Sequence, residues 1–370
     1  MRVGMTAIFQ NPFDQRPDRD VYRDDVALAT LAEPLGFDSV WGVEHHFTDY
    51  TMCPDVLQFL TFVAGRTRHV QLGSMVVVLP WHDPLRVAEQ AAMLDNLSDG
   101  RLILGIGRGL GRVEFEGFRV PMEESRGRFV ESAEMILRGL EDGFCEYDGR
   151  FVKQPRKPIR PKPVRTFRGR TYAAAVSPES AEIMAKLGVG ILIIPQKPWD
   201  AVAAELGDYR RTYRAANGVE APPTVCAGWV FCDPDPGRAR EMAVRYIGGY
   251  WGSVLRHYEL EGDHLGRTKG YEYYGNVQNM VHEVGAEAVS EFFLNLQIWG
   301  TPEQCYERIL DVRSRVGNDT FVGAFSYAGM PAAEAERSMR LFAREVVPEL
   351  RKLEARAAGP GVAAGASSRT

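Results

Sequence analysis

The residues best suited to chemistry in this chain stand where hydrophobic runs end. Glu44, His45 and His46 follow the run Ser39–Val43. Arg108 lies among closely spaced glycines after a later run. An imidazole changes protonation near neutral pH, so the histidines could move protons. Glycines let the backbone approach a ligand closely and arginine grips phosphate with two donors, so the second group suits an anion.

The stretch from Val70 to Gly111 contains elements that must position these side chains. Branched apolar residues from Val70 to Leu79 predict a strand buried on both faces, as parallel barrel strands are. A helical pattern over residues 85–97 follows, and Leu102–Ile106 predicts the next strand. The glycine-rich loop around Arg108 would therefore lie at the carboxyl end of a strand.

The same alternation continues along the chain. Further strands are expected at Val3–Phe9, Ser39–Val43, Thr171–Ala175, Val189–Ile194, Thr224–Phe231 and Phe321–Phe325. Further helices are expected at Val21–Leu35, Asp55–Arg66, Arg126–Phe144, from Ser177, at Trp199–Ala216, Pro236–Trp251 and Glu283–Leu296, from Thr301 and at Pro331–Leu353. Strands that alternate with helices predict an α/β fold, a single (β/α)8 TIM barrel. Its active-site face would hold Glu44, His45, His46, Arg108, Ser177 and Ser180, which all follow strands.

Three segments depart from this pattern. Residues 147–170 are rich in Pro, Lys and Arg and predict a polar insertion with a solvated basic face. Residues 259–279, after the seventh strand, have no clear period and predict a long functional loop, typical of a lid. The small residues of 359–370 predict disorder. We therefore expect one barrel domain over residues 1–355, with insertions, and a disordered tail over residues 356–370.

Composition excludes several classes of function. The 370 residues carry a formal net charge of −5, which gives no nucleic-acid footprint. No apolar run approaches the roughly 18 residues of a membrane span. The start, MRVGMTAIF, lacks the cleavage region of a signal peptide, so we expect a cytoplasmic protein. The five cysteines are widely spaced and lack metal-ligand spacing, so we expect free thiols and no metal.

Several long motifs resemble one enzyme family. VWGVEHHFTDY, LGSMVVVLP with HDPLR, LDNLSDGRLILGIGRGL, FEGFRVPMEESR and TKGY are similar, in the same order, to the α subunit of bacterial luciferase and its flavin-dependent monooxygenase relatives. The resemblance implies a TIM barrel that binds reduced FMN (FMNH₂), which reacts with O₂ to give a C4a-hydroperoxide that oxygenates a second substrate. Because no dinucleotide fingerprint is visible, it also implies a separate NAD(P)H:flavin reductase as partner.

The resemblance assigns catalytic roles to the histidine cluster. His45 matches the family's catalytic histidine, an acid/base beside the flavin. The alternative for His45 is a satisfied polar group at a strand end, and His46 is expected to be structural. Glu44 would orient the cluster by hydrogen bonding, or form a buried ion pair with an arginine.

The resemblance also assigns a cofactor site. The positions that hold the FMN phosphate in the family are matched by Arg108, Arg126, Ser177 and Ser180. Two guanidinium groups and the first turn of a helix make a coherent dianion site. Ser177 also has the position of a helix N-cap, and it can serve as both. Met75 and Val76 align with a cis non-prolyl peptide bond under the isoalloxazine ring.

Two departures from luciferase concern the substrate pocket. Gly107 stands where luciferase has a reactive cysteine, and Pro195 stands where it has a pocket tryptophan. Losing both side chains widens the cavity, so we expect a bulkier substrate than a straight-chain aldehyde. Phe9 and Trp251 are candidate pocket walls, although lone aromatic residues are more often core packing.

The expected reaction is hydroxylation, epoxidation or Baeyer–Villiger insertion by a two-component monooxygenase. Relatives of this kind include tailoring enzymes of antibiotic biosynthesis, so an aromatic secondary metabolite is the expected substrate. Two alternatives stay open. One is an F420-dependent hydride-transfer oxidoreductase on the same barrel, against which the luciferase-like EHHF motif argues. The other is a non-catalytic flavin-binding or β-like scaffold subunit, which would have no need of His45.

The resemblance further implies a homodimer. The helices with the apolar faces Leu57, Leu60, Ala88, Ala91 and Ala92 correspond to the dimer seam of the family. Sequence alone does not separate such a seam from ordinary packing of helices on the barrel. We expect no nucleic-acid or membrane partner.

Overall fold

The computed structural model describes residues 1–174 and 177–357. Most of the tail expected over residues 356–370 lies outside these described residues, as does the end of the strand expected at Thr171–Ala175. Among the helices described, none is long and apolar enough to cross a membrane.

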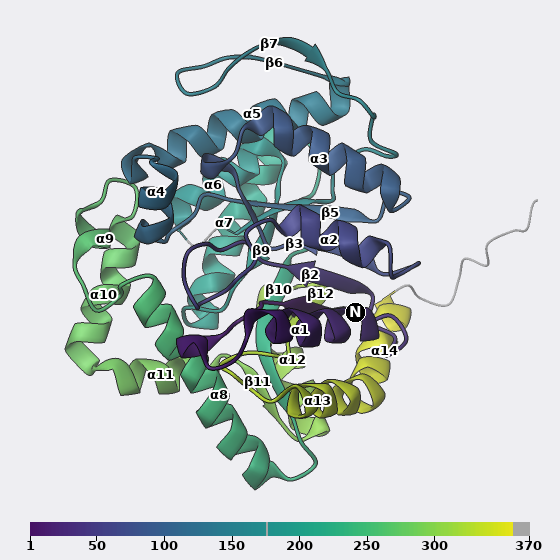
Figure 1. Ribbon diagram of the computed structural model, residues 1–370, viewed down its shortest axis with the longest axis vertical. Helices are drawn as coiled ribbons and strands as arrows, with labels where there is room; N and C mark the ends of the chain where they lie inside the picture. The colour runs from purple at the N-terminus through teal and green to yellow at the C-terminus, as the bar shows by residue number, and fades with distance from the viewer. Residues whose placement is uncertain (175–176, 358–370) are drawn as a thin grey trace, which may run out of the picture.

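Eight parallel strands close into a barrel at the centre of the molecule (Figure 1). They are β1 Arg2–Ala7, β2 Ser39–Gly42, β3 Gln71–Ser74, β5 Leu102–Gly107, β8 Thr171–Ala174, β9 Gly190–Ile193, β10 Val225–Cys232 and β12 Thr320–Ala324. Each pairs with the next along this series, and β12 returns to β1 with Val3 beside Phe321. Almost every residue in these strands is buried, which explains their nearly continuous apolar sequences. The predicted (β/α)8 barrel is confirmed.

Helices surround the barrel (Figure 1). They are α1 Asp18–Leu31, α2 Val56–Ala64, α3 Pro84–Leu97, α4 Arg112–Phe118, α5 Ser125–Asp142, α6 Pro178–Leu187, α7 Trp199–Asn217, α8 Pro236–His257, α9 His264–Arg267, α10 Glu272–Val284, α11 Ala286–Asn295, α12 Pro302–Val316, α13 Ala332–Glu345 and α14 Val347–Ala357. Short 3-10 helices lie at Pro12–Asp14, Leu79–Trp81 and Met122–Glu124. Five helices begin at an N-cap residue whose side chain accepts a backbone N–H group of the first turn. These residues are Asp55, Asp83, Ser177, Asp235 and Thr301.

The structure corrects the sequence interpretation at several segments. The strand expected over Val70–Leu79 is two strands, β3 and β4 (Val77–Val78), separated at Met75 and Val76. The polar insertion contains an antiparallel hairpin, β6 (Phe144–Asp148) and β7 (Lys153–Pro158), which lies outside the barrel beside α5 (Figure 1). A further strand, β11 (Ile298–Gly300), extends the sheet at β10.

The segment expected as a loop over residues 259–279 is largely helical. It contains α9 and the first part of α10, and α8 also extends six residues beyond the predicted end at Trp251. Together with α11, these helices stand over one side of the barrel (Figure 1). The sequence predicted a long functional loop here but not the helices within it, because its many polar, aromatic and glycine residues showed no clear apolar period.

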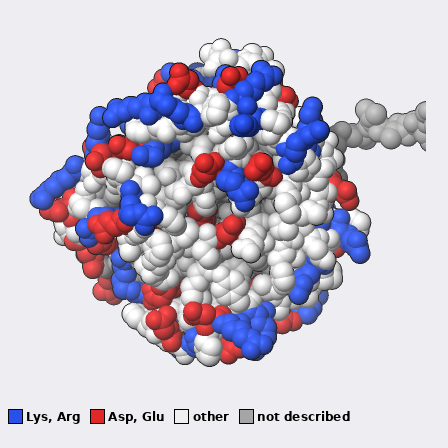
Figure 2. All heavy atoms as spheres, turned by 45° about the horizontal axis from the view of Figure 1, so that its top comes forward, with Lys and Arg blue, Asp and Glu red and all other residues white. Residues whose placement is uncertain are grey.

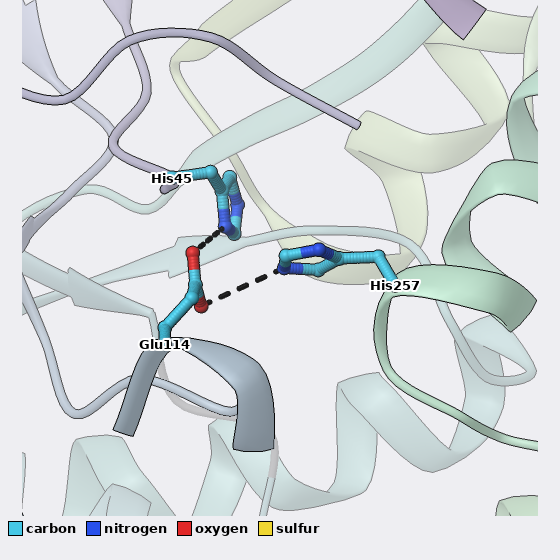
Figure 3. Close-up of side chains that lie close together, drawn as sticks. All are labelled: His45, Glu114 and His257. Carbon is cyan, nitrogen blue, oxygen red and sulfur yellow. Dashed lines mark hydrogen bonds and ion pairs between the residues drawn. The ribbon is translucent and has the colours of Figure 1, made fainter. Parts of the chain in front are cut away.

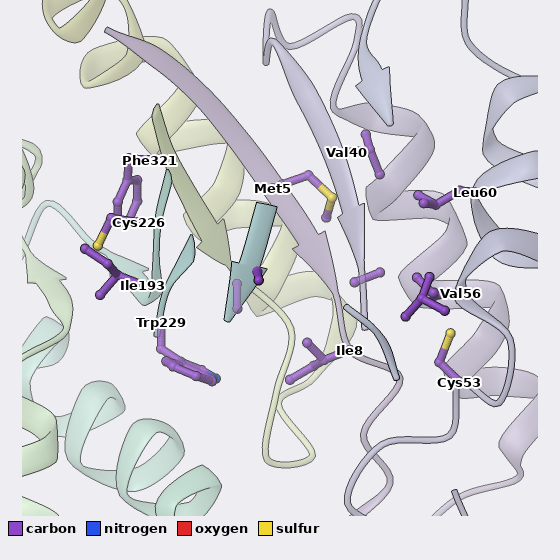
Figure 4. Close-up of a cluster of buried hydrophobic side chains, with 14 of the residues drawn as sticks. Met5, Ile8, Val40, Cys53, Val56, Leu60, Ile193, Cys226, Trp229 and Phe321 are labelled. Carbon is purple, nitrogen blue, oxygen red and sulfur yellow. The ribbon is translucent and has the colours of Figure 1, made fainter. Parts of the chain in front are cut away.

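One hydrophobic core joins the strands to the helices outside them (Figure 4). Val56 and Leu60 of α2 pack with Val40 and Met5 of the barrel strands. The faces matched to the family's dimer seam belong to this core, since Leu57 is 4% exposed and the other four residues are fully buried. The apolar side chains that α2 and α3 expose are instead Phe62, Met93 and Leu97.

Candidate active site

A cleft of about 1040 Å³ lies at the carboxyl ends of the barrel strands. It is lined by most of the residues that the sequence singled out: Glu44, His45, Met75, Val76, Gly107, Arg108, Arg126, Ser177 and Ser180. The structure therefore brings together side chains from four loops, as expected for residues that follow parallel strands. Figure 2 shows basic and acidic groups interspersed around a largely uncharged expanse of one face.

His45 is held by a carboxylate from another part of the chain, Glu114 (Figure 3). The Nδ1 atom of His45 lies 3.0 Å from Oε1 of Glu114, which also accepts the backbone N–H of His46 at 2.9 Å. Glu114 is fully buried on α4, directly after the glycine-rich loop. When Nδ1 of His45 carries the proton, it donates to Glu114, and Nε2 is left to act on a ligand.

A second imidazole lies on the other side of the same carboxylate (Figure 3). Nε2 of His257 is 3.6 Å from Oε2 of Glu114, and Nδ1 of His257 is 2.9 Å from the Thr48 hydroxyl. Burial raises the pKa of Glu114, but the two histidine rings outweigh it and hold that pKa at about 2. Burial lowers the pKa of His257, which favours its neutral form. Glu114 is therefore an anion throughout the neutral range.

The three side chains have the types that can bind a transition metal. Their ligand atoms lie within 4.8 Å of one another. However, Oε1 of Glu114 already accepts two hydrogen bonds, from the His45 ring and the His46 amide. The arrangement is the one in which a carboxylate fixes the orientation and tautomer of an acid/base histidine.

Glu44 orients the histidine cluster by hydrogen bonding, the first of the two roles expected for it, although its contact is with His46 and not with His45. Its Oε1 lies 3.2 Å from Nε2 of His46 and 2.7 Å from Nε2 of His82, and its Oε2 accepts the Val78 amide at 3.1 Å. Burial raises the pKa of Glu44, yet these hydrogen bonds bring it below the ordinary value. Glu44 thus orients His46 and pairs with a histidine rather than an arginine, and Glu114 takes the role beside His45.

Tyr258 completes the surroundings of His45. Its hydroxyl lies 3.4 Å from Nε2 of His45, and the side chain lines the cleft. Burial raises the pKa of Tyr258 well above its ordinary value, so the hydroxyl keeps its proton. The chain Glu114, His45, Tyr258 therefore leads from a buried anion to a protonated hydroxyl at the cleft.

The candidate anion site consists of two arginines and a helix N-terminus. Arg108 donates to the Gly270 carbonyl at 2.7 Å, and Arg126 donates to the same oxygen at 3.3 Å. Arg108 also lies over the Tyr271 ring at 4.1 Å. The TKGY motif thus lies against the arginines through its backbone carbonyl. Ser177 caps α6, accepting the Ser180 amide at 3.2 Å, so its expected N-cap role is confirmed.

The residues present fit a phosphate-bearing flavin. The Nε atom of Arg126 is buried without a hydrogen-bond partner among the described residues, so a donor is available there. Gly107 lets the Val76 side chain pack against the backbone, because a Cβ at position 107 would lie 2.3 Å from Cγ2 of Val76. The Met75–Val76 peptide bond is cis, as expected from the resemblance. Anion donors at one end and close backbone in the middle suit a phosphate joined to a flat ring system.

A second cavity, of about 720 Å³, adjoins the first. The two share the lining residues His45, Met75, Ile194, Gln196 and Tyr258. Trp251 lines this cavity, as expected for a pocket wall. Phe9 is fully buried against Tyr22 and Phe59 and belongs to the core, the alternative that its lone aromatic character favoured. Pro195 is flanked by two lining residues but is itself absent from the lining of either cavity.

Several site residues were missed from the sequence. They are Glu114, His257, Tyr258, His82 and Gln196. The signal for Glu114 was an acidic residue in the apolar run VEF beside the glycine-rich loop, and HDPLR contained His82. No sequence pattern indicated His257 and Tyr258, because both lie beyond the predicted end of α8 at Trp251.

The barrel, with an imidazole between a pair of arginines and a cavity with aromatic walls, has the architecture of TIM-barrel enzymes. The family model described as luciferase-like monooxygenase matches residues 1–319, and the chain belongs to that family.

Named relatives agree with this assignment. The alkanal monooxygenase alpha chain of Aliivibrio fischeri is 26% identical over 337 residues, covering 86% of this chain and 90% of that protein. The oxygenase component of the flavin-dependent trigonelline monooxygenase of Acinetobacter baylyi is 28% identical over 224 residues, or 60% and 62% of the two chains. The crystal structure of a monooxygenase from Streptomyces bottropensis is 28% identical with a TM-score of 0.74, covering 94% and 99%.

Proposed function

We propose that this protein is an FMNH₂- and O₂-dependent monooxygenase, the oxygenase component of a two-component system. The observation that carries the proposal is the meeting of His45, held by Glu114, with the pair Arg108 and Arg126 in one cleft. The first pair suits proton transfer and the second suits a phosphate, so one cleft holds both groups that a flavin site needs.

The cofactor would be held by its phosphate. Arg108, Arg126 and the first turn of α6 at Ser177 and Ser180 supply the donors. To reach both arginines, a phosphate must compete with the Gly270 carbonyl that they contact and with the Glu179 carboxylate, to which Arg126 donates at 2.5 Å. When bound, reduced flavin supplies the electrons that activate O₂.

The protein's own contribution is to control protons and water. Glu114 keeps the proton of His45 on Nδ1, so Nε2 of His45 can accept a proton from, or return one to, a group in the cleft. Tyr258 can donate a hydrogen bond at the same place. The apolar walls of the second cavity exclude water from the substrate side of His45.

The reductase is proposed as a separate protein. The sequence contains no dinucleotide-binding fingerprint, and one relative is named as an oxygenase component. We further propose a homodimer, which would cover the exposed apolar side chains Phe62, Met93 and Leu97 of α2 and α3.

An anaerobic titration separates this proposal from the alternatives. The protein is titrated with FMNH₂, reduced riboflavin and reduced F420, and binding is followed by flavin or deazaflavin absorbance. We expect the tightest binding for FMNH₂ and at least tenfold weaker binding for reduced riboflavin, which lacks the phosphate. Tighter binding of reduced F420 than of FMNH₂ would instead assign a hydride-transfer enzyme. A non-catalytic scaffold subunit would bind FMNH₂ but would form no oxygenated product, with or without His45.

A further inference from the structure

The second cavity differs chemically from the flavin cleft that it adjoins. Its lining includes no Lys, Arg, Asp or Glu among the described residues, and His45 is its one imidazole. Burying a charged group without a partner is costly. An occupant of this cavity should therefore carry no net charge.

The walls of the cavity are largely aromatic. Trp229 lies against Tyr250, with ring centroids 4.2 Å apart, and Trp251 stacks on Phe293 at 4.8 Å. Phe293 also lies 5.4 Å from Trp229, so the two indoles flank one phenyl ring. Broad ring faces of this kind favour flat, aromatic ligands over flexible chains.

Two hydrogen-bond donors in these walls have no acceptor within the part of the chain that the structure describes. They are the buried Nε1 atoms of Trp229 and Trp251, whereas Trp299, outside the cavity, donates its Nε1–H to the Leu294 carbonyl at 3.0 Å. Trp229 and Trp251 are 7% and 5% exposed, and both line the cavity. Figure 4 shows Trp229 with its indole directed across the ends of the barrel strands, on the side of Ile8, another lining residue. A buried donor left unpaired is unfavourable, so an occupant with acceptor oxygens would relieve it.

We propose that the substrate is a neutral, flat, polycyclic aromatic ketone or quinone whose oxygens accept hydrogen bonds from the indole N–H groups of Trp229 and Trp251. This rests on the proposed function, because the cavity is a substrate site only if the adjoining cleft holds the flavin. The two cavities share His45 and Met75, so such a molecule would reach the acid/base group without leaving the aromatic walls. An aldehyde with a linear chain would satisfy one donor at most.

Binding to the protein without flavin tests the inference independently of turnover. Anthraquinone has two carbonyl acceptors and no charge, anthracene has the same rings without oxygen, and an anthraquinone carboxylate adds a charge. Equilibrium dialysis is used to measure the affinity of each, and of decanal. We expect anthraquinone to bind at least tenfold more tightly than each of the other three.

Two variants locate the donors. Trp229→Phe and Trp251→Phe keep an aromatic ring but remove the N–H group, and each should weaken anthraquinone binding by roughly five- to tenfold while leaving anthracene binding within about twofold. Trp299→Phe is the matched control and should leave both affinities unchanged. Circular dichroism and thermal unfolding identify any variant that fails to fold, and for such a variant the ligand series on the wild-type protein decides the question.

The outcomes separate this inference from the proposed function. Equal affinity for anthraquinone and anthracene, or tighter binding of decanal, would overturn the inference even if FMNH₂ binds and reacts with O₂. Unchanged anthraquinone affinity in both tryptophan variants would also overturn it. If the protein binds anthraquinone selectively but does not bind FMNH₂, the ligand class inferred for the cavity holds and the proposed function is wrong.

Discussion

The proposed flavin cleft and the adjoining aromatic cavity differ in chemistry, although both lie on one face of the barrel. The cleft gathers two arginines, an imidazole and two buried carboxylates at the ends of neighbouring strands. The cavity contains rings, aliphatic side chains and unpaired indole donors. His45, Met75 and Tyr258 stand at their border. Under the proposed function, the charged groups would hold and orient the cofactor, the uncharged surface would select the substrate, and His45 would serve both.

Removing the border imidazole should have the largest effect. His45→Ala should leave FMNH₂ affinity nearly intact and lower the yield of oxygenated product by about 10²-fold or more, because proton transfer in the transition state is lost. The yield is measured by mass spectrometry on a neutral aromatic ketone that the wild-type protein oxygenates. His69→Ala, on the exposed surface, is the control. Undiminished product from His45→Ala would show that another group manages the protons.

Removing a cation from the cleft should affect the cofactor alone. Arg108→Ala should weaken FMN binding by roughly 10- to 100-fold, because charge-assisted hydrogen bonds to a phosphate are lost. Riboflavin, which has no phosphate, should bind the variant and the wild-type protein equally. Fluorescence quenching of the free flavins measures both affinities. An equal loss of riboflavin affinity would show that Arg108 does not bind the phosphate. The cleft and the cavity would then not differ in the way proposed.

Neutralising the carboxylate behind His45 should have an intermediate effect. Glu114→Gln should lower turnover by about tenfold, because the amide no longer enforces the Nδ1–H form of His45. The pKa of Glu114 is about 2, below its ordinary value of 4.5. Its ionised form therefore stabilises the folded protein fully above pH 4.5, and this contribution is lost as the pH falls toward 2.

Unfolding in urea at several pH values checks that stability effect. The free energy of unfolding of the wild-type protein should exceed that of Glu114→Gln near pH 6, and the difference should shrink on acidification below pH 4.5. Curves that stay parallel between pH 6 and pH 3 would mean that Glu114 has no depressed pKa in the folded protein.

The smallest effect is expected from adding a side chain at Gly107. Gly107→Ala places a Cβ 2.3 Å from Cγ2 of Val76, so the neighbouring backbone or side chain must shift. We expect a loss of about 1–3 kcal/mol in the free energy of unfolding and weaker FMN binding. Gly207→Ala, in the middle of α7 and free of close backbone neighbours, should be neutral or stabilising. Thermal unfolding of both variants compares the two sites. If Gly107→Ala and Gly207→Ala are equally stable, the Val76 side chain moves aside at little cost.

The sequence predicted the barrel because its strands are short, buried on both faces and separated by helices with a clear apolar period. It also predicted the residues at strand ends, since the carboxyl ends of parallel strands meet on one face: His45, Arg108 and Ser177 all line the cleft. The cis bond at Met75 came from the resemblance alone.

The partners of those residues were harder to find. Glu114 lies 69 positions from His45 and on a helix of seven residues, too short for a period to show. Phe9 has a positive φ of 50°, which turns it into the core, and no sequence pattern signals that rotation. The helix α9 was missed because it has only four residues, and α10 was missed because its apolar period begins among the aromatic and glycine residues that predicted a loop. Long-range contacts of this kind form only when the chain has folded, so no local sequence pattern signals them.

The most direct test of the account is to mix the anaerobic FMNH₂ complex rapidly with O₂ and record flavin absorbance over time. We expect a species distinct from both reduced and oxidised FMN that persists in the wild-type protein, because the walls exclude water and Glu114 fixes His45. Direct return to oxidised FMN at the rate of free flavin would contradict the monooxygenase proposal.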